Sequence, residues 1–391
     1  MIIKKILPLI KTFISLISIN ILIHLKKKNK KIIFFYFPVK IYQEHLIKIA
    51  NKINKRSLVI LAYNSYSKTQ IKKFKNSFFI EFNYIKFIPF ANFFLKDINL
   101  CISSYLMYHY PPNSKNIYIS HDIYDAPMIN SKLEKRLFIQ INKLDYILLS
   151  SKISIKGFKS KFNFYNIKIK PKLINIGYPK LDHVYKKIKN TKKNKKNGVT
   201  LIAPGYSLHY KKYNMYQSIS KIISTLMSEN NNKIIYRPHP LDLTHKGQKK
   251  KVYDIIDKFK IYKNFKADLS ISYINSYLDS KMLITDLSSI AYTYAFATEK
   301  PVIFFSKNEN ELKKNKFFKT SYIQDRKKIG TICANHCKII KSKNKIELNY
   351  NNYVSKIKIL RDKRIKYFKK STQETENQIN NILKDINLIN H

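Results

Sequence analysis

The stretch KMLITDLSSIAYTYAFATEKPVIFF, from Lys281 to Phe305, decides the fold class. An apolar run that ends at Asp286 is followed by a serine pair, an alanine-containing helical segment, a Lys-Pro dipeptide and a second apolar run. Two short apolar strands joined by a helix are typical of a parallel β-α-β unit, because parallel strands need a crossover connection. The stretch therefore predicts part of a parallel sheet that is covered by helices on both faces.

The same alternation continues toward the N-terminus. Strand-like runs open the segments VTLIAP (199–204) and KIIYRPHP (233–240), and helices are predicted near residues 213–227 and 248–259. These segments predict an α/β domain over residues 199–345. Earlier in the chain, the runs KIIFFYFP, SLVILAY, INLCISS, NIYIS and LDYILLS predict another α/β domain over residues 31–185.

The remaining segments indicate how the two domains are connected. Residues 186–198, KKIKNTKKNKKNG, have almost no apolar side chain and predict an exposed basic linker. Residues 346–391 are charged and helical, contain no strand of their own, and are expected to pack across the domain junction. The predicted fold is two doubly wound, Rossmann-like α/β domains that face a cleft, where the carboxyl ends of the strands bind ligands.

An apolar and basic segment occupies residues 1–30. The part Ile6–Leu25 is about long enough, at roughly 20 residues, to cross a bilayer. Lys11, Asn20 and His24 interrupt it, and no small-residue cleavage site follows, which argues against a signal peptide. An interfacial helix, a membrane span and a helix packed on the first domain all remain open, but the short connection to the next strand favours an interfacial or packed helix.

Composition indicates the kind of partner. The 391 residues contain 75 Lys and Arg against 24 Asp and Glu, a net charge of +51. This excess is spread along the whole chain and no nucleic-acid motif is present, so we expect anionic substrates and an anionic membrane surface but no nucleic acid. With six glycines and neither glycine-rich phosphate motif, any phosphate must be held by helix N-termini, hydroxyls and cationic side chains.

Cysteine content gives little indication of a disulfide or metal site. Three cysteines are too few for a disulfide scaffold, which favours a reducing cytoplasm. Cys333, His336 and Cys337 lie in the segment CANHC, but no second cluster of ligands accompanies them. We therefore expect no metal and no cofactor.

Two segments of the second domain carry candidate functional groups. Proline residues flank His239 and restrict the backbone around it, while Arg237 offers a planar fork of donors that suits phosphate. Histidine can donate to an oxygen or move a proton near neutral pH. In the stretch quoted first, Ser288 is the predicted N-cap, and with Ser289 and the first N–H groups of the helix it makes an anion site. Because both segments follow strands of one domain, we expect them to form one site.

Together these segments resemble the CDP-glycerol glycerophosphotransferase family, the polyol phosphate polymerases and primases of the teichoic-acid type. The resemblance covers about residues 116–305. The matching positions are Gly177, Pro179 and Asp182, with Lys180 in place of the usual arginine; Ala203 and Pro204; Arg237 to Pro240; Asp286, Ser288 and Ser289; and Lys300 and Pro301. The resemblance implies a GT-B fold, a CDP-alditol donor and transfer of a polyol phosphate with release of CMP. The donor-binding residues that it implies are Pro204, Arg237, Asp286, Ser288 and Ser289, with His239 beside the leaving group.

The first domain departs from the pattern of that family. The family usually carries a Trp-His-Gly-Thr-Pro element whose histidine acts as the base, whereas this chain has no tryptophan and reads ISHDIYDAP. The resemblance implies that His121 is the base and that Asp122 or Asp125 orients it. The missing glycine and threonine leave the acceptor undefined.

The predicted function is transfer of glycerol phosphate or a similar polyol phosphate to a hydroxyl of a cell-surface glycan or lipid-linked acceptor. The enzyme is expected to be peripheral, on the cytoplasmic face of the cell membrane. Two alternatives remain open. An inverting glycosyltransferase of the same fold would use a nucleotide sugar in capsule or lipooligosaccharide synthesis, and a basic binding protein would transfer nothing.

Overall fold

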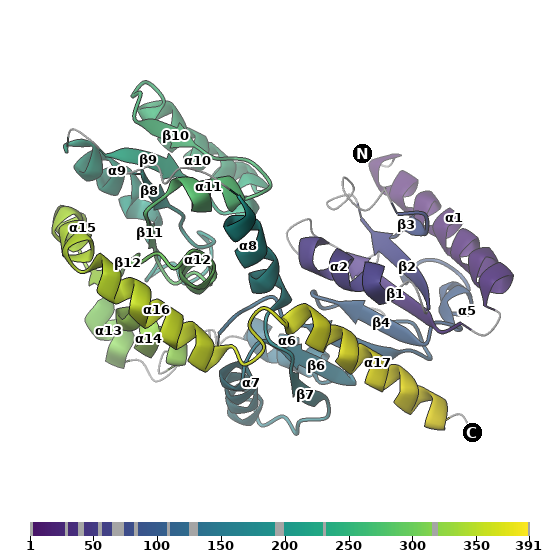
Figure 1. Ribbon diagram of the computed structural model, residues 1–391. Coiled ribbons are helices and arrows are strands. Elements are labelled where there is room, and N and C mark those ends of the chain that lie inside the picture. Colours follow the sequence, from purple (N-terminus) through teal and green to yellow (C-terminus); the bar gives the residue numbers. More distant parts are fainter. Residues whose placement is uncertain are drawn as a thin grey trace. The chain divides into compact units, whose positions relative to one another are not determined.

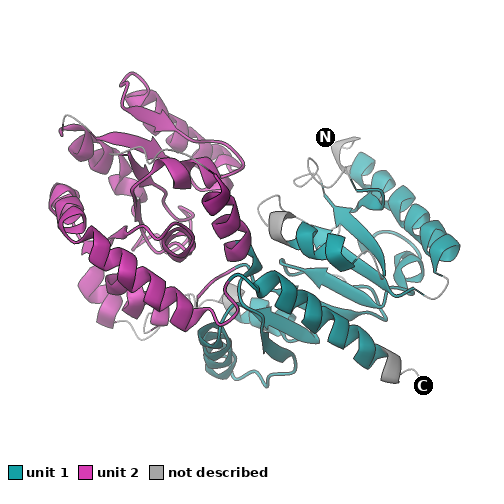
Figure 2. Ribbon diagram, in the orientation of Figure 1, with its two compact units in different colours: residues 1–121, 131–180, 369–391 teal, residues 122–130, 181–368 magenta. Residues whose placement is uncertain are grey.

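The computed structural model describes residues 3–27, 30–37, 43–53, 57–64, 74–81, 85–107, 110–124, 132–191, 199–229, 232–314 and 320–389. The chain forms two compact units (Figure 2). Unit 1 contains residues 1–121, 131–180 and 369–391, and unit 2 contains residues 122–130 and 181–368. Each unit is built on one parallel β-sheet, as the alternating pattern of the sequence predicts.

Within the described residues, the sheet of unit 1 has seven strands in the order β3-β2-β1-β4-β5-β6-β7, with every neighbouring pair parallel. The strands are β1 (Ile32–Phe37), β2 (Leu58–Tyr63), β3 (Ser77–Phe79), β4 (Leu100–Ser103), β5 (Lys115–Ile119), β6 (Tyr146–Leu149) and β7 (Lys172–Asn175). The helices are α1 (Ile3–Lys26), α2 (Gln43–Ile53), α5 (Ala91–Leu95), α6 (Lys132–Ile141), α7 (Lys152–Phe164) and α17 (Ser371–Ile389).

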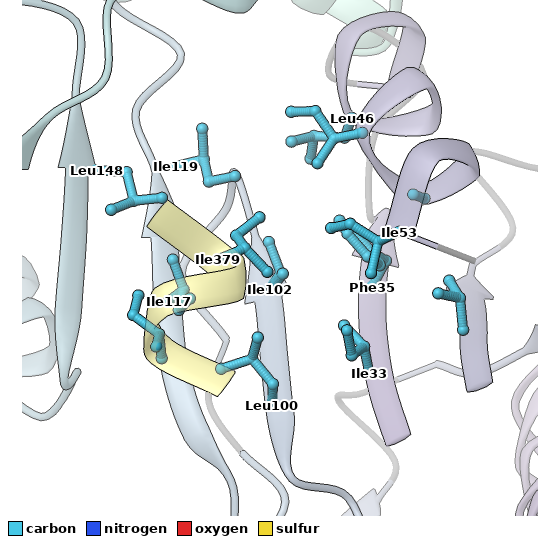
Figure 3. Packing of buried hydrophobic residues seen from close by; sticks show 14 of the residues in the cluster. Ile33, Phe35, Leu46, Ile53, Leu100, Ile102, Ile117, Ile119, Leu148 and Ile379 are labelled. Carbon is cyan, nitrogen blue, oxygen red and sulfur yellow. The ribbon is translucent and has the colours of Figure 1, made fainter. Parts of the chain in front are cut away.

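Side-chain alternation along β1 explains how helices cover both faces of this sheet. Ile33 and Phe35 point into a core with α2 and with Ile379 of α17, which Figure 3 shows lying against the strands. The intervening Ile32 and Phe34 point to the opposite face and pack with α1. All six residues of β1 are buried, so the period-2 alternation of a strand places apolar side chains in two separate cores.

Within the described residues, the sheet of unit 2 has six strands in the order β10-β9-β8-β11-β12-β13, again all parallel. The strands are β8 (Val199–Ile202), β9 (Lys233–Tyr236), β10 (Phe265–Ala267), β11 (Met282–Thr285), β12 (Val302–Phe305) and β13 (Gly330–Cys333). The helices are α8 (Pro179–Asn190), α9 (Ile219–Met227), α10 (Lys246–Phe259), α11 (Ile274–Asp279), α12 (Ile290–Thr298), α13 (Glu309–Lys314), α14 (Ser321–Ile329), α15 (Ile339–Leu348) and α16 (Tyr350–Arg364). The stretch that opens the sequence analysis forms β11, α12 and β12.

The connecting segments differ in part from the predicted linker and C-terminal helices. Residues 186–190 continue helix α8 rather than lying in an extended linker, and residues 192–198 lie outside the described part of the chain. Helix α16 packs against α12 and α14 of unit 2, whereas α17 packs against α2 of unit 1 (Figure 1). The amphipathic face of α17 therefore completes the core of the first sheet, although this helix is the last element of the chain.

Candidate active site

The candidate site residues of unit 2 follow three neighbouring strands. Strands β9, β8 and β11 lie side by side in the sheet, and because they are parallel their carboxyl ends meet at one edge. Ala203 follows β8, Arg237 follows β9 and Asp286 follows β11. The structure thus brings together the three unit 2 segments that the sequence analysis selected.

Asp286 holds the loop after β8 in place. Its side chain is buried, and its two oxygens accept hydrogen bonds from the backbone N–H groups of Gly205 and Met215, each at 2.8 Å. A Cβ atom at position 205 would lie 2.9 Å from Oδ1 of Asp286, so a larger residue here would displace the Asp286 carboxylate or the loop. Burial raises the pKa of the Asp286 carboxyl above its usual value, although both hydrogen bonds act to lower it. Asp286 therefore shapes the loop that borders the site.

Arg237 also has partners within the protein. Its guanidinium donates to Oδ2 of Asp268 at 2.6 Å and to the carbonyl oxygens of Ser270 at 2.8 Å and Ile271 at 3.3 Å. The ion pair is almost buried, with 8% and 10% of the two side chains exposed. The guanidinium fork therefore joins the end of β9 to the segment after β10, which the sequence analysis did not anticipate when it assigned Arg237 to donor phosphate.

Lys300 has a comparable structural role. Its ammonium group donates to the carbonyl oxygens of Tyr277 at 2.8 Å and Leu278 at 3.2 Å, and also to that of Ser280. These carbonyls belong to the end of α11 and the residue after it, where a helix leaves acceptors without partners inside the helix. The Lys-Pro element of the sequence therefore stabilises the end of α11 and begins β12.

His239 is held in one orientation by its own turn. Its Nδ1 accepts a hydrogen bond from the N–H of Leu241 at 3.2 Å, at the start of a short 3₁₀ helix over Pro240–Leu243. A nitrogen that accepts a hydrogen bond carries a lone pair, so the proton of the neutral ring lies on Nε2. The flanking prolines and this bond present Nε2–H as a hydrogen-bond donor.

Three imidazole rings surround Tyr206, which lies in the loop after β8. The centroid of the Tyr206 ring lies 4.9 Å from that of His209, 5.5 Å from that of His239 and 6.1 Å from that of His245. The buried Asp242 accepts a hydrogen bond from Ser207 beside this cluster. The sequence pattern does not predict this aromatic cluster, because its members come from two loops that only the sheet brings together.

The serine pair lies at the start of α12. Ser289, rather than the predicted Ser288, is the N-cap residue, and its side chain makes no capping hydrogen bond. The carbonyl of Ser288 accepts a hydrogen bond from the hydroxyl of Tyr322 at 2.8 Å, which fixes the backbone of the pair. The N-terminus of α12 and two serine hydroxyls therefore lie at the same sheet edge as His239. Helix N-termini and hydroxyls in this arrangement suit an anion.

In unit 1, His121 lies just beyond the end of β5. Its Nδ1 lies 3.2 Å from the carbonyl oxygen of Ser104 and 3.0 Å from the hydroxyl oxygen of Tyr118. A carbonyl oxygen can only accept, so the contact with Ser104 favours the tautomer that carries its hydrogen on Nδ1 and its lone pair on Nε2. The hydroxyl of Tyr178 donates to the backbone carbonyl of His121, and the preceding Gly177 has a φ of 74°. The Gly177–Tyr178 pair, a matched element of the sequence, therefore anchors the backbone of His121.

The residues after His121 belong to unit 2. Asp122 is the first of them, and Asp125 lies outside the described residues. Tyr124 stacks on Tyr292 of α12, with ring centroids 4.0 Å apart, and its hydroxyl donates to Asp325 at 2.7 Å. The chain is thus anchored on α12 within three residues of His121.

Asp325 is the centre of a buried polar network. Burial by itself would raise the pKa of its carboxyl, but hydrogen bonds from Lys328, Tyr124 and Arg364 outweigh burial and hold this pKa below its usual value. The carboxylate therefore remains ionised beneath the stacked tyrosines.

No group of three or more His, Cys, Asp or Glu side chains within the described residues is placed to hold a metal ion. Cys333 is buried and Cys337 is exposed, and the imidazole of His336 lies 3.4 Å from the sulfur of Cys337.

Comparisons with known proteins identify relatives of this chain. The profile of a family described as CDP-Glycerol:Poly(glycerophosphate) glycerophosphotransferase matches residues 20–383. The minor teichoic acid biosynthesis protein GgaB of Bacillus subtilis (strain 168) is 25% identical over 335 residues, which are 76% of this chain and 33% of GgaB. The chain thus spans about a third of the length of that relative.

Solved structures show the same fold. The wall teichoic acid polymerase TagF has a TM-score of 0.62 and 19% identity, with 100% of this chain and 98% of that chain covered. A UDP-GlcNAc 2-epimerase from Neisseria meningitidis, bound to UDP-GlcNAc, has a TM-score of 0.54 and 12% identity, with 90% and 100% covered. These likenesses confirm the predicted GT-B-like fold of two Rossmann-like α/β units.

Proposed function

Because this chain belongs to the CDP-glycerol:poly(glycerophosphate) glycerophosphotransferase family, we propose that it transfers a polyol phosphate from a CDP-activated donor and releases CMP. The transferred group is glycerol phosphate or a close relative. The acceptor is a hydroxyl of a cell-surface glycan or of a lipid-linked precursor. The enzyme works at the cytoplasmic face of the cell membrane as a peripheral protein.

One arrangement in particular supports this proposal: the hydrogen bonds at Nδ1 of the two candidate histidines favour opposite tautomers. In His121 the carbonyl of Ser104 beside Nδ1 favours the tautomer with the hydrogen on Nδ1, in which Nε2 is the nitrogen that accepts a proton. In His239 the N–H of Leu241 occupies Nδ1, so Nε2 can donate a hydrogen bond. A transfer between two oxygens needs one group of each kind, a base for the attacking hydroxyl and a donor for the departing phosphate.

The reaction step follows from these two roles. The acceptor oxygen attacks the phosphorus that bears the polyol, and Nε2 of His121 takes the hydroxyl proton. The bond from that phosphorus to the oxygen bridging the two phosphates breaks, and its electron pair leaves with CMP. His239 donates to the oxygen on which this negative charge develops. A positioned base typically contributes about 10²- to 10⁴-fold in rate.

We propose that the diphosphate of the donor lies over the N-terminus of α12. Ser288 and Ser289 supply hydroxyls there, and the helix supplies backbone N–H groups. Pro204 and Asp286 border this position by shaping the loop after β8. The hydrogen bonds of Arg237 support a positioning role for that residue, because its guanidinium holds the segment after β10.

Acceptor-side chemistry can be tested with His121 variants. His121→Ala should lose transfer while retaining affinity for the CDP donor, and His239→Ala should lose both. His336→Ala, a histidine outside both loops, is the matched control. If His121→Ala keeps near-normal transfer across the pH range, the base is another group, and Asp122 and Asp125 are the next candidates.

The substrate class can be tested directly on the purified chain. CDP-glycerol, CDP-ribitol and several nucleotide sugars are offered with a glycan acceptor, and CMP release and product mass are measured. We expect CMP release and a mass increase equal to a polyol phosphate. Incorporation of a bare sugar with release of a nucleoside diphosphate would identify a glycosyltransferase instead and would refute the proposal.

A further inference from the structure

Helix α1 has apolar side chains on two opposite sides. On one side Leu16, Ile19 and Ile23 are fully buried and pack against the sheet of unit 1. Thr12, one turn earlier, accepts a hydrogen bond from the N–H of Glu81 at 3.0 Å. The spacing of four, three and four residues places these side chains on one side of the helix. This side fixes the helix along the sheet.

The other side of α1 is exposed although it is strongly apolar. Its large hydrophobic side chains have between 40% and 78% of their surface exposed; they are Ile6, Leu7, Ile10, Phe13, Ile14, Ile21 and Leu25. At 3.6 residues per turn they lie on the side of the helix away from the buried stripe. An amphipathic helix on the surface of a water-soluble protein would carry polar residues on its exposed side.

A second group of exposed aromatic side chains adjoins this side. Phe87, Phe90 and Phe93 are 62%, 79% and 50% exposed and lie in and just before α5. Helices α1 and α5 pack together (Figure 1), and Phe13 of α1 contacts Phe94 of α5 edge-to-face with ring centroids 6.2 Å apart. We call the ten exposed side chains of the two groups the α1–α5 apolar surface. Monomeric soluble proteins rarely expose apolar patches of this extent without a partner.

Lysine side chains border the α1–α5 apolar surface. The Nζ atoms of Lys86 and Lys96 lie 4.7 Å and 4.1 Å from the ring centroids of Phe87 and Phe93. Lys11 of α1 is also exposed beside this surface, and Lys26 and Lys27 are exposed at the C-terminal end of the helix. Among the described residues of α1, of α5 and of the turns beside them, the acidic side chains are Asp97, which pairs with Lys27 at 3.1 Å, and Glu81, which is buried. Apolar side chains with a cationic border are complementary to acyl chains beneath anionic headgroups.

The packing of α1 indicates whether this helix spans a membrane or lies on its surface. The segment Ile6–Lys26 is long and apolar enough to span, with a mean hydropathy of 2.1. However, Leu16, Ile19 and Ile23 cover apolar side chains of β1 and β2, so a spanning helix would have to leave this core open to water. A helix that keeps one side on the sheet can only place its other side in the membrane interface.

We propose that the α1–α5 apolar surface inserts into one leaflet of a membrane that contains anionic phospholipid. Helix α1 lies parallel to the membrane plane, Phe87, Phe90 and Phe93 enter the acyl boundary, and the lysines contact phosphate headgroups. This inference deepens the proposed function, since a membrane-bound enzyme reaches a lipid-linked acceptor directly. Binding itself needs neither donor nor acceptor, so it can fail or succeed independently of transfer.

The depth of insertion can be measured with one introduced tryptophan, because the natural chain has none. Phe90→Trp provides the probe, and Ile261→Trp provides the matched control, since Ile261 is 75% exposed in unit 2. We expect the emission of the first variant to shift to the blue with vesicles of phosphatidylglycerol and phosphatidylcholine and to be quenched by brominated acyl chains. The control should show neither change. Unchanged emission from the Phe90→Trp variant would overturn the inference.

The binding energy can be tested by vesicle flotation of the full chain. A triple variant, Phe87→Ser with Phe90→Ser and Phe93→Ser, should lower the vesicle-bound fraction by at least about tenfold. The matched control changes two exposed residues of unit 2, Ile261→Ser and Leu348→Ser, and should float like the unchanged chain. Far-UV circular dichroism verifies that both variants are folded.

Three outcomes of flotation would contradict the proposal. Equal flotation of the triple variant and the unchanged chain would show that the aromatic group does not insert. Equal flotation with pure phosphatidylcholine would remove the role of anionic headgroups. A dimer that dissociates in the triple variant, with no binding to vesicles, would identify a second copy of the chain as the partner. Deletion of residues 1–25 is a weaker test, because it also removes the buried stripe of α1 from the sheet.

Discussion

Substituting Arg237 by alanine tests whether this residue holds the fold or the donor. The sequence motif predicts that Arg237 binds donor phosphate, whereas in the structure its guanidinium donates to Asp268 at 2.6 Å and to the carbonyls of Ser270 and Ile271. Only 8% of its side chain is exposed. These contacts predict that Arg237→Ala destabilises unit 2 before it affects any bound ligand.

The size of this effect follows from the burial of the ion pair. Removing one partner of a buried pair costs about 3–5 kcal/mol, because the other charge remains in a poorly solvated position. Ser270 and Ser276 also donate to Asp268 and continue to stabilise that carboxylate, which reduces the cost. We therefore expect the free energy of unfolding to fall by about 3 kcal/mol, near the lower end of the range.

Urea denaturation measures this change. Far-UV circular dichroism and the fluorescence of the 29 tyrosines can follow unfolding, since no tryptophan is present. Lys266→Ala, an exposed lysine of β10, is the matched control for loss of a positive charge. In a double-mutant cycle, the variant that combines Arg237→Ala with Asp268→Ala should lose less free energy of unfolding than the sum of the two single losses. The reason is that neither partner is left as an unpaired buried charge.

A clear result would refute this reasoning. If Arg237→Ala unfolds at the same urea concentration as the unchanged chain, and if the KM for the CDP donor rises by about 100-fold or more, the residue is a donor ligand. The hydrogen bonds to Asp268 and the two carbonyls would then contribute little to stability.

Three further predictions concern the site and its support. Gly205→Ala should destabilise unit 2 and raise the KM for the CDP donor, since its Cβ would lie 2.9 Å from Asp286; unchanged thermal unfolding would contradict this. His239→Ala should abolish donor binding measured by calorimetry, whereas His121→Ala should retain it and lose CMP release; equal affinity losses would contradict the separate roles. The folded-state pKa of Asp325 is lowered, so its contribution to stability is present above the unfolded value of about 3.9 and is lost as the pH falls through the folded value. The free energy of unfolding of Asp325→Asn should therefore fall less between neutral and acidic pH than that of the unchanged chain. Equal decreases in the variant and the unchanged chain would contradict this.

The amino-acid sequence by itself was sufficient to predict the central strands of both sheets. Strands such as β1, β2, β8 and β11 are buried along their whole length and therefore read as continuous apolar runs. The strands that the sequence analysis did not identify are β3, β7, β10 and β13, which form the four edges of the two sheets. Strands β3, β7 and β10 are partly exposed, so their sequences lack the apolar run that marks a central strand, whereas β13 is mostly buried but begins with Gly330 and Thr331.

The sequence also predicted that the candidate segments of unit 2 lie at one sheet edge, because motifs that follow neighbouring strands of a parallel sheet gather there. Only the tertiary structure decided what each side chain does there. Arg237 meets Asp268 and Asp286 meets Gly205, partners that are 31 and 81 residues away along the chain. Nδ1 of His121 faces a carbonyl 17 residues earlier. A polar side chain has a fixed number of donors and acceptors, and the neighbours that fold against it determine which of them remain for a substrate.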